Sequence, residues 1–238
     1  MTQRIVVCAV AVLTLASLAA AEDNTRKLSL GLAYLATSGN SDSSTFGLDL
    51  KLDQQTGPWG LETVASFMRA ATDGELTAER YSVGVRGKRQ VAERWQVFVG
   101  ASGLKDEFAG LDSRLMLESG ATFLALKNDT HELSFDAGVA WNREKQVTGG
   151  TESYMSGIAG ARYQWTITET SAFTQRVVFL PSFDDSKDWR LESETALQAA
   201  LSARTALKLA YQVRRDNRPV PGFKKTDTTT VASLVMTF

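Results

Sequence analysis

The sequence predicts an all-β protein: a transmembrane, antiparallel, up-and-down β-barrel of about 12 strands. Three observations predict it: apolar and polar residues alternate with a period of two, the alternating segments are about 10 to 14 residues long, and the connections between them alternate in length. A strand tilted by ~45° needs about 9–11 residues to cross the hydrocarbon core of a bilayer. Strands of soluble proteins are nearer 5–6 residues, so these segments favour a membrane protein.

The composition excludes several classes of protein. The 26 Lys and Arg nearly balance the 27 Asp and Glu, so we expect no nucleic-acid partner. An apolar share of 43% is too low for a helical membrane protein and too high for a disordered chain. One Cys and one His exclude a disulfide framework and a zinc finger. We therefore expect neither a metal site nor a cofactor.

The first 21 residues have the three regions of a secretory signal peptide. Arg4 supplies a positive charge, residues 5–18 form an uncharged apolar run of 14, and Ala19–Ala21 form an A-x-A cleavage site. As a helix this run would rise only ~21 Å, short of the ~30 Å core of a bilayer. We expect a signal peptide at 1–21, a linker at 22–26 and a barrel at 27–238, in the outer membrane of a Gram-negative bacterium.

The alternation is clearest in residues 45–53, where Phe46, Leu48, Leu50 and Leu52 share one face and polar residues share the other. The faces are least distinct in 113–126 and 152–165, where small residues interrupt the pattern. The predicted strands cover 27–36, 44–53, 59–69, 79–90, 95–105, 113–126, 131–144, 152–165, 171–181, 189–201, 206–215 and 226–238.

The connections fall into two groups by length. The odd-numbered ones have seven to ten residues and lie at 37–43, 70–78, 106–112, 145–151, 182–188 and 216–225. The even-numbered ones have four or five residues and lie at 54–58, 91–94, 127–130, 166–170 and 202–205. Outer-membrane barrels combine an even number of strands with short periplasmic turns and longer outer loops. A soluble lipocalin-like barrel needs no such asymmetry.

Aromatic residues support the same orientation. All 5 Trp fall at the ends of predicted strands, where barrels place their interfacial girdles. The chain ends in Phe238, with Met236 and Leu234 on the same face. We interpret these three residues as an assembly signal for the barrel assembly machinery. The expected partners are this machinery and outer-membrane lipid, and the sequence predicts no oligomeric state.

Several segments carry a family resemblance: TSGNSDSSTFGLDL, TGPW, TAERYSVGV, FAGLDSRL, FLPSF, PGFKKTDTTT and SLVMTF. In these segments, and over roughly residues 27–238, the chain resembles the YdiY-like family of salt-induced outer-membrane proteins. The resemblance implies an outer-membrane barrel with no assigned biochemical activity. It offers no catalytic residues to carry over.

Candidate catalytic residues are few. His131, the only histidine, adjoins a short turn, whereas a lipase-type barrel needs a Ser–His pair near the outer leaflet. We interpret it as a solvated turn residue. Glu192 and Glu194 share one face about 7 Å apart, a spacing that suits an inverting glycosidase. Arg176 and Lys208 on neighbouring strands can neutralise them, which favours an interior ion-pair lattice.

One loop contains three acidic residues, Asp184, Asp185 and Asp188, which could hold Ca²⁺ weakly. A solvated acidic loop is the favoured interpretation. No catalytic, cofactor or metal residues are therefore assigned, and we predict that the protein is not an enzyme.

The inward face is charged on every side. It carries ten predicted cations (Lys51, Arg80, Arg86, Lys88, Arg114, Arg162, Arg176, Arg190, Lys208 and Arg214) and six predicted acids (Asp49, Glu62, Glu118, Asp136, Glu192 and Glu194). A surplus of four positive groups leaves two interpretations: a hydrated, weakly anion-preferring pore, or a barrel closed by ion pairs across the lumen.

The predicted function is thus a narrow pore for ions or small solutes, or a structural envelope or stress-response component. One alternative is an outer-membrane barrel enzyme acting on lipid or glycan, which requires polar residues converging at the outer rim. The other is a soluble periplasmic β-barrel.

Overall fold

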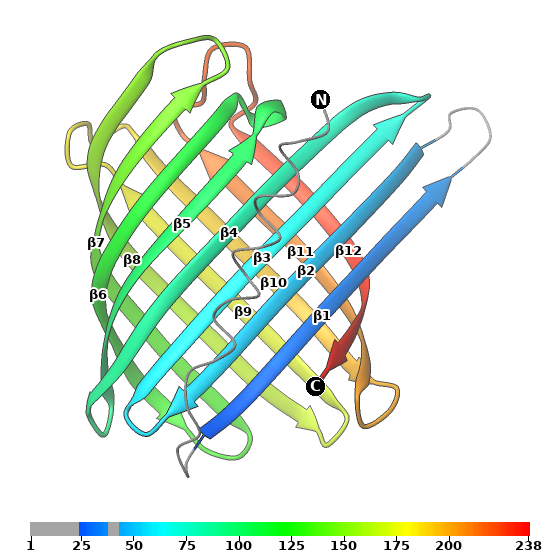
Figure 1. Cartoon of the computed structure of the whole chain (residues 1–238), viewed down its shortest axis with the longest axis vertical. Helices are drawn as coiled ribbons and strands as arrows, with labels where there is room; N and C mark the ends of the chain where they lie inside the picture. The colour runs from blue at the N-terminus through cyan, green and yellow to red at the C-terminus, as the bar shows by residue number, and fades with distance from the viewer. Residues whose placement is uncertain (1–23, 38–42) are drawn as a thin grey trace.

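The computed structural model describes residues 24–37 and 43–238 and shows a closed barrel (Figure 1). Each strand pairs antiparallel with its sequence neighbours, and β12 pairs with β1. The predicted signal peptide at 1–21 lies outside the described residues. Within them, no helix is long and apolar enough to cross a membrane. The strands are β1 (Asn24–Thr37), β2 (Ser43–Thr56), β3 (Trp59–Thr72), β4 (Glu75–Ala92), β5 (Trp95–Asp106), β6 (Leu111–Lys127), β7 (His131–Gln146), β8 (Thr151–Thr168), β9 (Ser171–Pro181), β10 (Trp189–Ala200), β11 (Thr205–Asp216) and β12 (Thr226–Thr237).

All twelve predicted strands are confirmed, and their bounds differ from the predicted ones by at most four residues. The connection predicted at 70–78 is a two-residue turn, Asp73–Gly74, with φ of 52° and 80°. Positive φ at both positions is what a tight hairpin turn requires. The end of the barrel that holds Asp73–Gly74 is called the loop end, and the opposite end is called the turn end. The described connections have two to nine residues at the loop end and two to four residues at the turn end. β1 begins at Asn24, inside the predicted linker.

The outer face of the wall is apolar along most of its height. On β5, Val99 points outward and is 65% exposed, and Leu115, Leu117 and Leu209 are exposed on other strands. Aromatic residues mark both ends: the Phe46, Phe67 and Tyr81 rings follow one another at the loop end, whereas Trp59 and Trp95 are exposed at the turn end. An apolar band between aromatic girdles is the lipid-facing surface of a membrane barrel.

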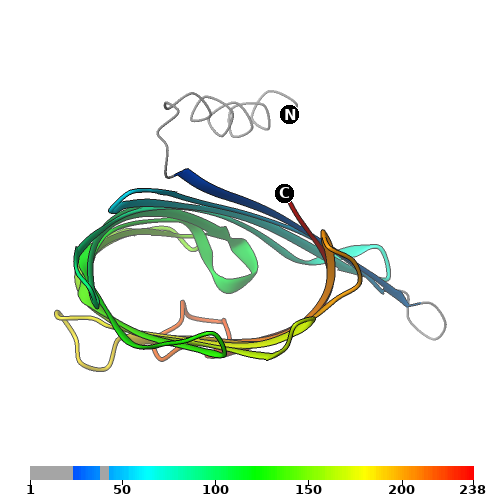
Figure 2. The same ribbon diagram turned by 90° about the horizontal axis from the view of Figure 1, so that it is seen from below.

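The ring of strands is flattened (Figure 2). Gly120 of β6 and Gly138 of β7 are direct partners, and a Cβ on either would collide with a carbonyl oxygen of the other strand. The Phe98 ring, 3% exposed, packs from inside the barrel against the same place, with its Cζ 2.7 Å from the Cβ position of Gly120. Only glycine fits at these two positions, so they allow β6 and β7 to approach closely.

The seam between β1 and β12 is much shorter than the other strand pairings. It has four register partners, from Ser29↔Thr237 to Leu32↔Leu234, followed by reciprocal backbone hydrogen bonds between Leu28 and Phe238. Every other strand pairing has at least nine register partners. Towards the loop end, β1 and β12 diverge (Figure 1).

Candidate pore lumen

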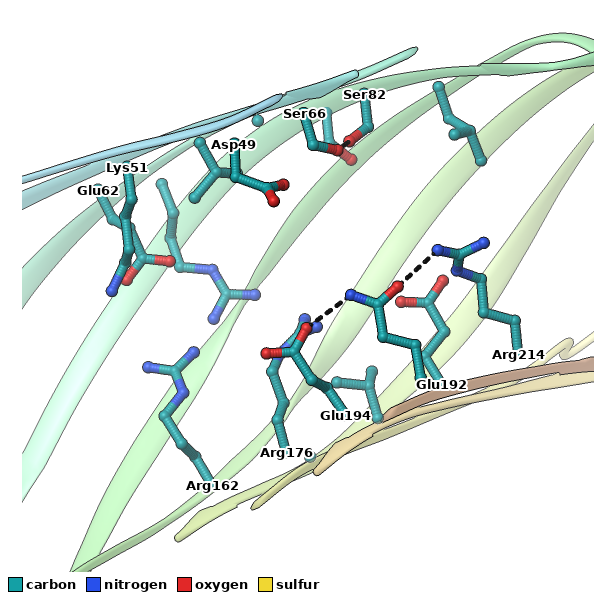
Figure 3. A pocket seen from close by; sticks show the side chains of 18 of the residues that line it. Asp49, Lys51, Glu62, Ser66, Ser82, Arg162, Arg176, Glu192, Glu194 and Arg214 are labelled. Atoms are coloured by element: carbon teal, nitrogen blue, oxygen red, sulfur yellow. Dashed lines mark hydrogen bonds between the residues drawn. The ribbon is translucent and has the colours of Figure 1, made fainter. Parts of the chain in front are cut away.

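The barrel encloses a cavity of about 700 Å³ that residues of all twelve strands line. Twelve of the thirteen residues predicted to line the lumen lie around it, and the thirteenth, Lys88, is paired with the lining residue Glu62. Figure 3 shows several of them projecting from opposite walls into the same space. The twelve are Lys51, Arg80, Arg86, Arg114, Glu118, Arg162, Arg176, Arg190, Glu192, Glu194, Lys208 and Arg214. Their role in conduction stays a prediction.

Arg86 organises the middle of the lumen. Its Nε donates to Glu118 Oε1 at 2.8 Å and its Nη1 to Asp136 Oδ2 at 3.1 Å. The guanidinium carbon lies 4.3 Å from the centroid of the Phe98 ring. Thr122 donates to the other oxygen of Asp136 at 2.6 Å. Since Arg86 is on β4 and Asp136 on β7, this network ties four neighbouring strands together.

A second network lies at the loop end around Glu144, which is 5% exposed. Glu144 accepts from Arg114 Nε at 2.7 Å, from Arg190 Nη2 at 3.2 Å and from the Tyr154 hydroxyl. Arg190 Nε also donates to Asp216 Oδ2 at 2.9 Å. The network joins β6, β7, β8, β10 and β11. Glu144 was not predicted as a lumen residue, although it has the same alternation as Asp136.

The expected surplus of positive charge in the lumen is wrong. Four further acids pair with lumen cations: Asp53 with Lys51, Asp106 with Arg80, Glu144 with Arg114 and Arg190, and Asp216 with Arg190. Added to the six predicted acids, they give ten acids against ten cations. All four lie at the end of a predicted strand or the start of a predicted connection, although the alternation places Asp53 and Glu144 on the inward face.

Some lumen charges have no partner of opposite sign within 4.0 Å among the described residues. These are the cations Arg162, Arg176 and Arg214, and the acids Asp49 and Glu192. Arg162 and Arg176 are direct partners on β8 and β9, a like-charge arrangement that costs stability.

The expected neutralisation of the two glutamates on β10 is present for only one of them. Lys208 Nζ donates to Glu194 Oε1 at 2.8 Å, and Gln212 donates to the other oxygen at 2.8 Å. Glu192 has no such partner, so the lattice predicted around this pair is incomplete.

Two loop-end segments meet across the mouth of the barrel, and we call them the lid. One is the 3-10 turn η2 (Glu107–Ala109) with Gly110, between β5 and β6; the other is 218–223, between β11 and β12. Gly110 has φ of 84°, and a Cβ there would lie 2.8 Å from Val220 Cβ. The two hairpins are on opposite sides of the ring, and both segments turn inward (Figure 2).

Neighbouring loops fasten the lid. Arg218 pairs with Asp185, Asn217 Nδ2 donates to the Lys187 carbonyl at 2.8 Å, and Val147 N donates to the Gly110 carbonyl at 3.0 Å. The backbone N–H of Lys187 and the nearby Arg218 guanidinium lower the pKa of Asp185. The acidic loop interpreted as merely solvated therefore helps to anchor the lid. Across the described residues, no group of acidic, His or Cys side chains is suited to a metal ion.

His131 is not a solvated turn residue. It begins β7 on the outer face, and its ring centroid lies 6.0 Å from that of Tyr163 and 6.1 Å from that of Trp165. Its Nδ1 is 2.9 Å from the Tyr163 hydroxyl. The only histidine is therefore part of the aromatic girdle on the outer face, because the strand alternation continues to the first residue of β7.

The predicted assembly residues lie at the seam. Leu234 and Phe238 are exposed on the outer face, and the Phe238 backbone closes the seam against Leu28. Their recognition by assembly machinery stays a prediction.

Comparisons with known proteins agree with this architecture. A family model described as "Protein of unknown function, DUF481" matches residues 30–238. Uncharacterized protein YdiY from Escherichia coli (strain K12) is 30% identical over 192 residues, which cover 80% of this chain and 74% of that relative. The NanC porin has a TM-score of 0.54 and 12% identity, over 89% of this chain and 98% of that one. The COG4313 outer membrane channel from Pseudomonas putida F1 has a TM-score of 0.53 and 12% identity, over 90% and 95%. This barrel shares the fold of outer-membrane porins and channels.

Proposed function

The chain belongs to the DUF481 family, and on that premise we propose that it forms a narrow, water-filled pore for ions and small polar solutes, without enzymatic activity. The observation that supports this function most is the charged cavity of about 700 Å³ along the barrel interior. Charged side chains around a lumen keep it hydrated and make it a path for small ions rather than for apolar solutes.

The distribution of polar groups argues against an enzyme. The charged side chains converge inside the barrel, and the only histidine faces outward within an aromatic cluster. A Ser–His pair of the lipase type would need a histidine next to a nucleophile. His131 has a tyrosine hydroxyl as its side-chain partner instead.

The even balance of ten cations and ten acids predicts weak selectivity. Paired charges cancel in part over short distances, so paired and unpaired groups together set the field in the lumen. The three unpaired arginines (Arg162, Arg176 and Arg214) outnumber the unpaired acids by one, but the paired groups hold eight acids against seven cations, so we expect no net preference for anions.

The lid limits the unit conductance. The contact between Gly110 and Val220 crosses the mouth at the loop end, so any solute has to pass beside it. A side chain at Gly110 would push Val220 and Phe223 away and widen the mouth.

Conductance in planar bilayers tests the proposal. The refolded wild type should give small unit steps, and Gly110→Ala should give larger ones. Gly74→Ala is the matched control: Gly74 has φ of 80°, close to that of Gly110, but its Cβ would have no neighbour within 4 Å. The control carries similar backbone strain and should conduct like wild type. Silence of both wild type and Gly110→Ala would overturn the pore and favour a purely structural envelope role.

Delivery to the membrane is part of the same proposal. Residues 1–21 serve as a cleaved signal peptide, and Phe238, Met236 and Leu234 present the finished chain to the assembly machinery of a Gram-negative outer membrane. The uncharged run of 14 residues and the apolar, alternating last strand support these two steps.

A further inference from the structure

We propose that the seam between β1 and β12 is a lateral opening that binds a single-chain phospholipid, with its zwitterionic headgroup in the lumen and its acyl chain in the membrane. Such a site is independent of ion conduction, because it depends on the wall of the barrel and not on its mouth.

The first observation is the loss of pairing along half of the seam. The last register pair is Leu32↔Leu234, and the same register would place Tyr34 opposite Ala232. In the described chain, Ala33–Thr37 and Thr226–Ser233 have no partners across the seam. Both segments are nevertheless regular strands, since β1 pairs with β2 to Thr37 and β12 pairs with β11 from Thr226. The pairing between β1 and β12 is therefore absent at the loop end. This end corresponds to the outer leaflet in barrels of this class.

The second observation is the lining of the wall at this place. Ser29 and Gly31 of β1, and Val231, Ser233 and Val235 of β12, line the cavity. Within the described residues, no charged side chain points inward from 29–33 of β1 or from 229–237 of β12. Charges on the inward register of these two strands lie further along each strand, at Lys27 opposite Asp53 and at Asp227 opposite Arg214. An acyl chain that passes between residues 29–33 and 229–237 meets small and apolar side chains and desolvates no charge there.

The unpaired backbone restricts what can occupy the opening. An unsatisfied N–H or C=O in hydrocarbon costs several kcal/mol, but irregular backbone is tolerated where it lines a water-filled cavity. The seam residues line the cavity on one side, and the outward Tyr34 and Leu234 face lipid on the other. Water and hydrocarbon meet at this place, which suits an amphiphile better than a wholly polar or a wholly apolar molecule.

Charged side chains on β2 and β11, the strands next to the seam, indicate which kind of headgroup can bind. Asp49 of β2 has no cationic partner, and its Oδ2 lies 3.8 Å from the Cβ position of Gly31, beside the seam. Lys51 of β2 and Lys208 of β11 line the same cavity, each in an ion pair with an acid of the barrel wall. An unpaired carboxylate can receive an ammonium group, and the two lysines can receive a phosphate that displaces those acids. A phosphoethanolamine headgroup carries both.

Site-directed fluorescence quenching tests the opening. Cys8 is the only cysteine and lies in the predicted signal peptide, so a fluorophore can be placed at one introduced cysteine of the processed chain. Val231→Cys puts it inside the lumen at the seam, and Ser102→Cys puts it inside the lumen on β5, away from the seam. The probe is lysophosphatidylethanolamine with a nitroxide on its acyl chain, in phosphatidylcholine vesicles. Quenching should be several-fold stronger at 231 than at 102.

The second part of the experiment uses a disulfide that closes the seam. Tyr34→Cys with Ala232→Cys joins the positions that the register would place opposite each other, and the oxidised variant should lose the difference between 231 and 102. Equal quenching at 231 and 102 in the open barrel would overturn the proposal. A disulfide between two chains, seen as a dimer on a non-reducing gel, would also overturn it, because a second copy would then cover the edges. Ion conductance, recorded separately on the same proteins, distinguishes failure of this site from failure of the pore.

Discussion

Val99 and Ser102 lie three residues apart on β5, one on the outer face of the barrel wall and the other on the inner face. On the outer face each residue meets hydrocarbon and acts largely alone, so its contribution depends on how apolar it is. On the inner face a residue such as Glu144 acts through three partners on three other strands. The outer face is therefore expected to respond additively to substitution, and the inner face in coupled groups.

Introduction of a positive charge should give the largest difference in stability between the two faces. Val99→Arg should destabilise the barrel by about 2–4 kcal/mol, because an arginine near the bilayer midplane loses its hydration. Ser102→Arg should cost far less, since its side chain enters the hydrated lumen. Urea titrations of refolding in vesicles measure both. Equal costs, or the smaller cost at Val99, would show that the faces are assigned the wrong way round.

Loss of one partner in the inner network should have the next largest effect. Glu144→Gln leaves the Arg114 and Arg190 guanidinium groups buried without their shared carboxylate, and about 1–3 kcal/mol of stability should be lost. Glu192→Gln is the matched control, because Glu192 lacks a cation within 4.0 Å, and its cost should be clearly smaller. A larger loss from the control would mean that the network around Glu144 does not hold the strands together.

Deletion of the C-terminal residue tests the role of the outer face in assembly. Deletion of Phe238 removes an exposed ring and both backbone hydrogen bonds to Leu28. Secretion should continue, whereas the heat-modifiable barrel in the membrane should fall several-fold and unfolded chain should accumulate in the periplasm. Phe238→Tyr, which keeps the ring and the backbone, should assemble normally. Unchanged barrel levels after the deletion would contradict the assembly signal.

Removal of two unpaired arginines should have the smallest effect, a change in ion selectivity. Arg162→Gln with Arg176→Gln removes two lumen cations and no ion pair, so the reversal potential in a salt gradient should shift towards cations. The shift should shrink as salt rises, because the Debye length falls from ~10 Å at 0.1 M to ~3 Å at 1 M. Lys145→Gln removes a cation from the outer face and should shift it much less. A shift towards anions in the double variant would contradict the proposed origin of selectivity.

The two faces also differ in how far the sequence predicts them. The strands and the apolar face follow from a local period of two, and the Asp73–Gly74 turn is signalled by its dipeptide, although residues 70–78 were predicted as a longer loop. The lumen partners are not local. Arg86 meets Asp136 three strands away, and Gly110 meets Val220 across the mouth. Such contacts depend on how the wall curves and on the depth of each side chain, which an alternating pattern does not contain.

The paired glycines of β6 and β7 have a consequence for the bore of the barrel. Twelve strands fix the circumference, but the area enclosed depends on how sharply the circumference is bent. At Gly120 and Gly138 the absence of two methyl groups permits a close approach that no other residue allows. Alanine at either position would place a methyl group against a carbonyl oxygen of the partner strand, so the local geometry of the wall would have to change. The cross-section available to a solute is therefore adjustable from within the wall, with no change to the charges or the loops.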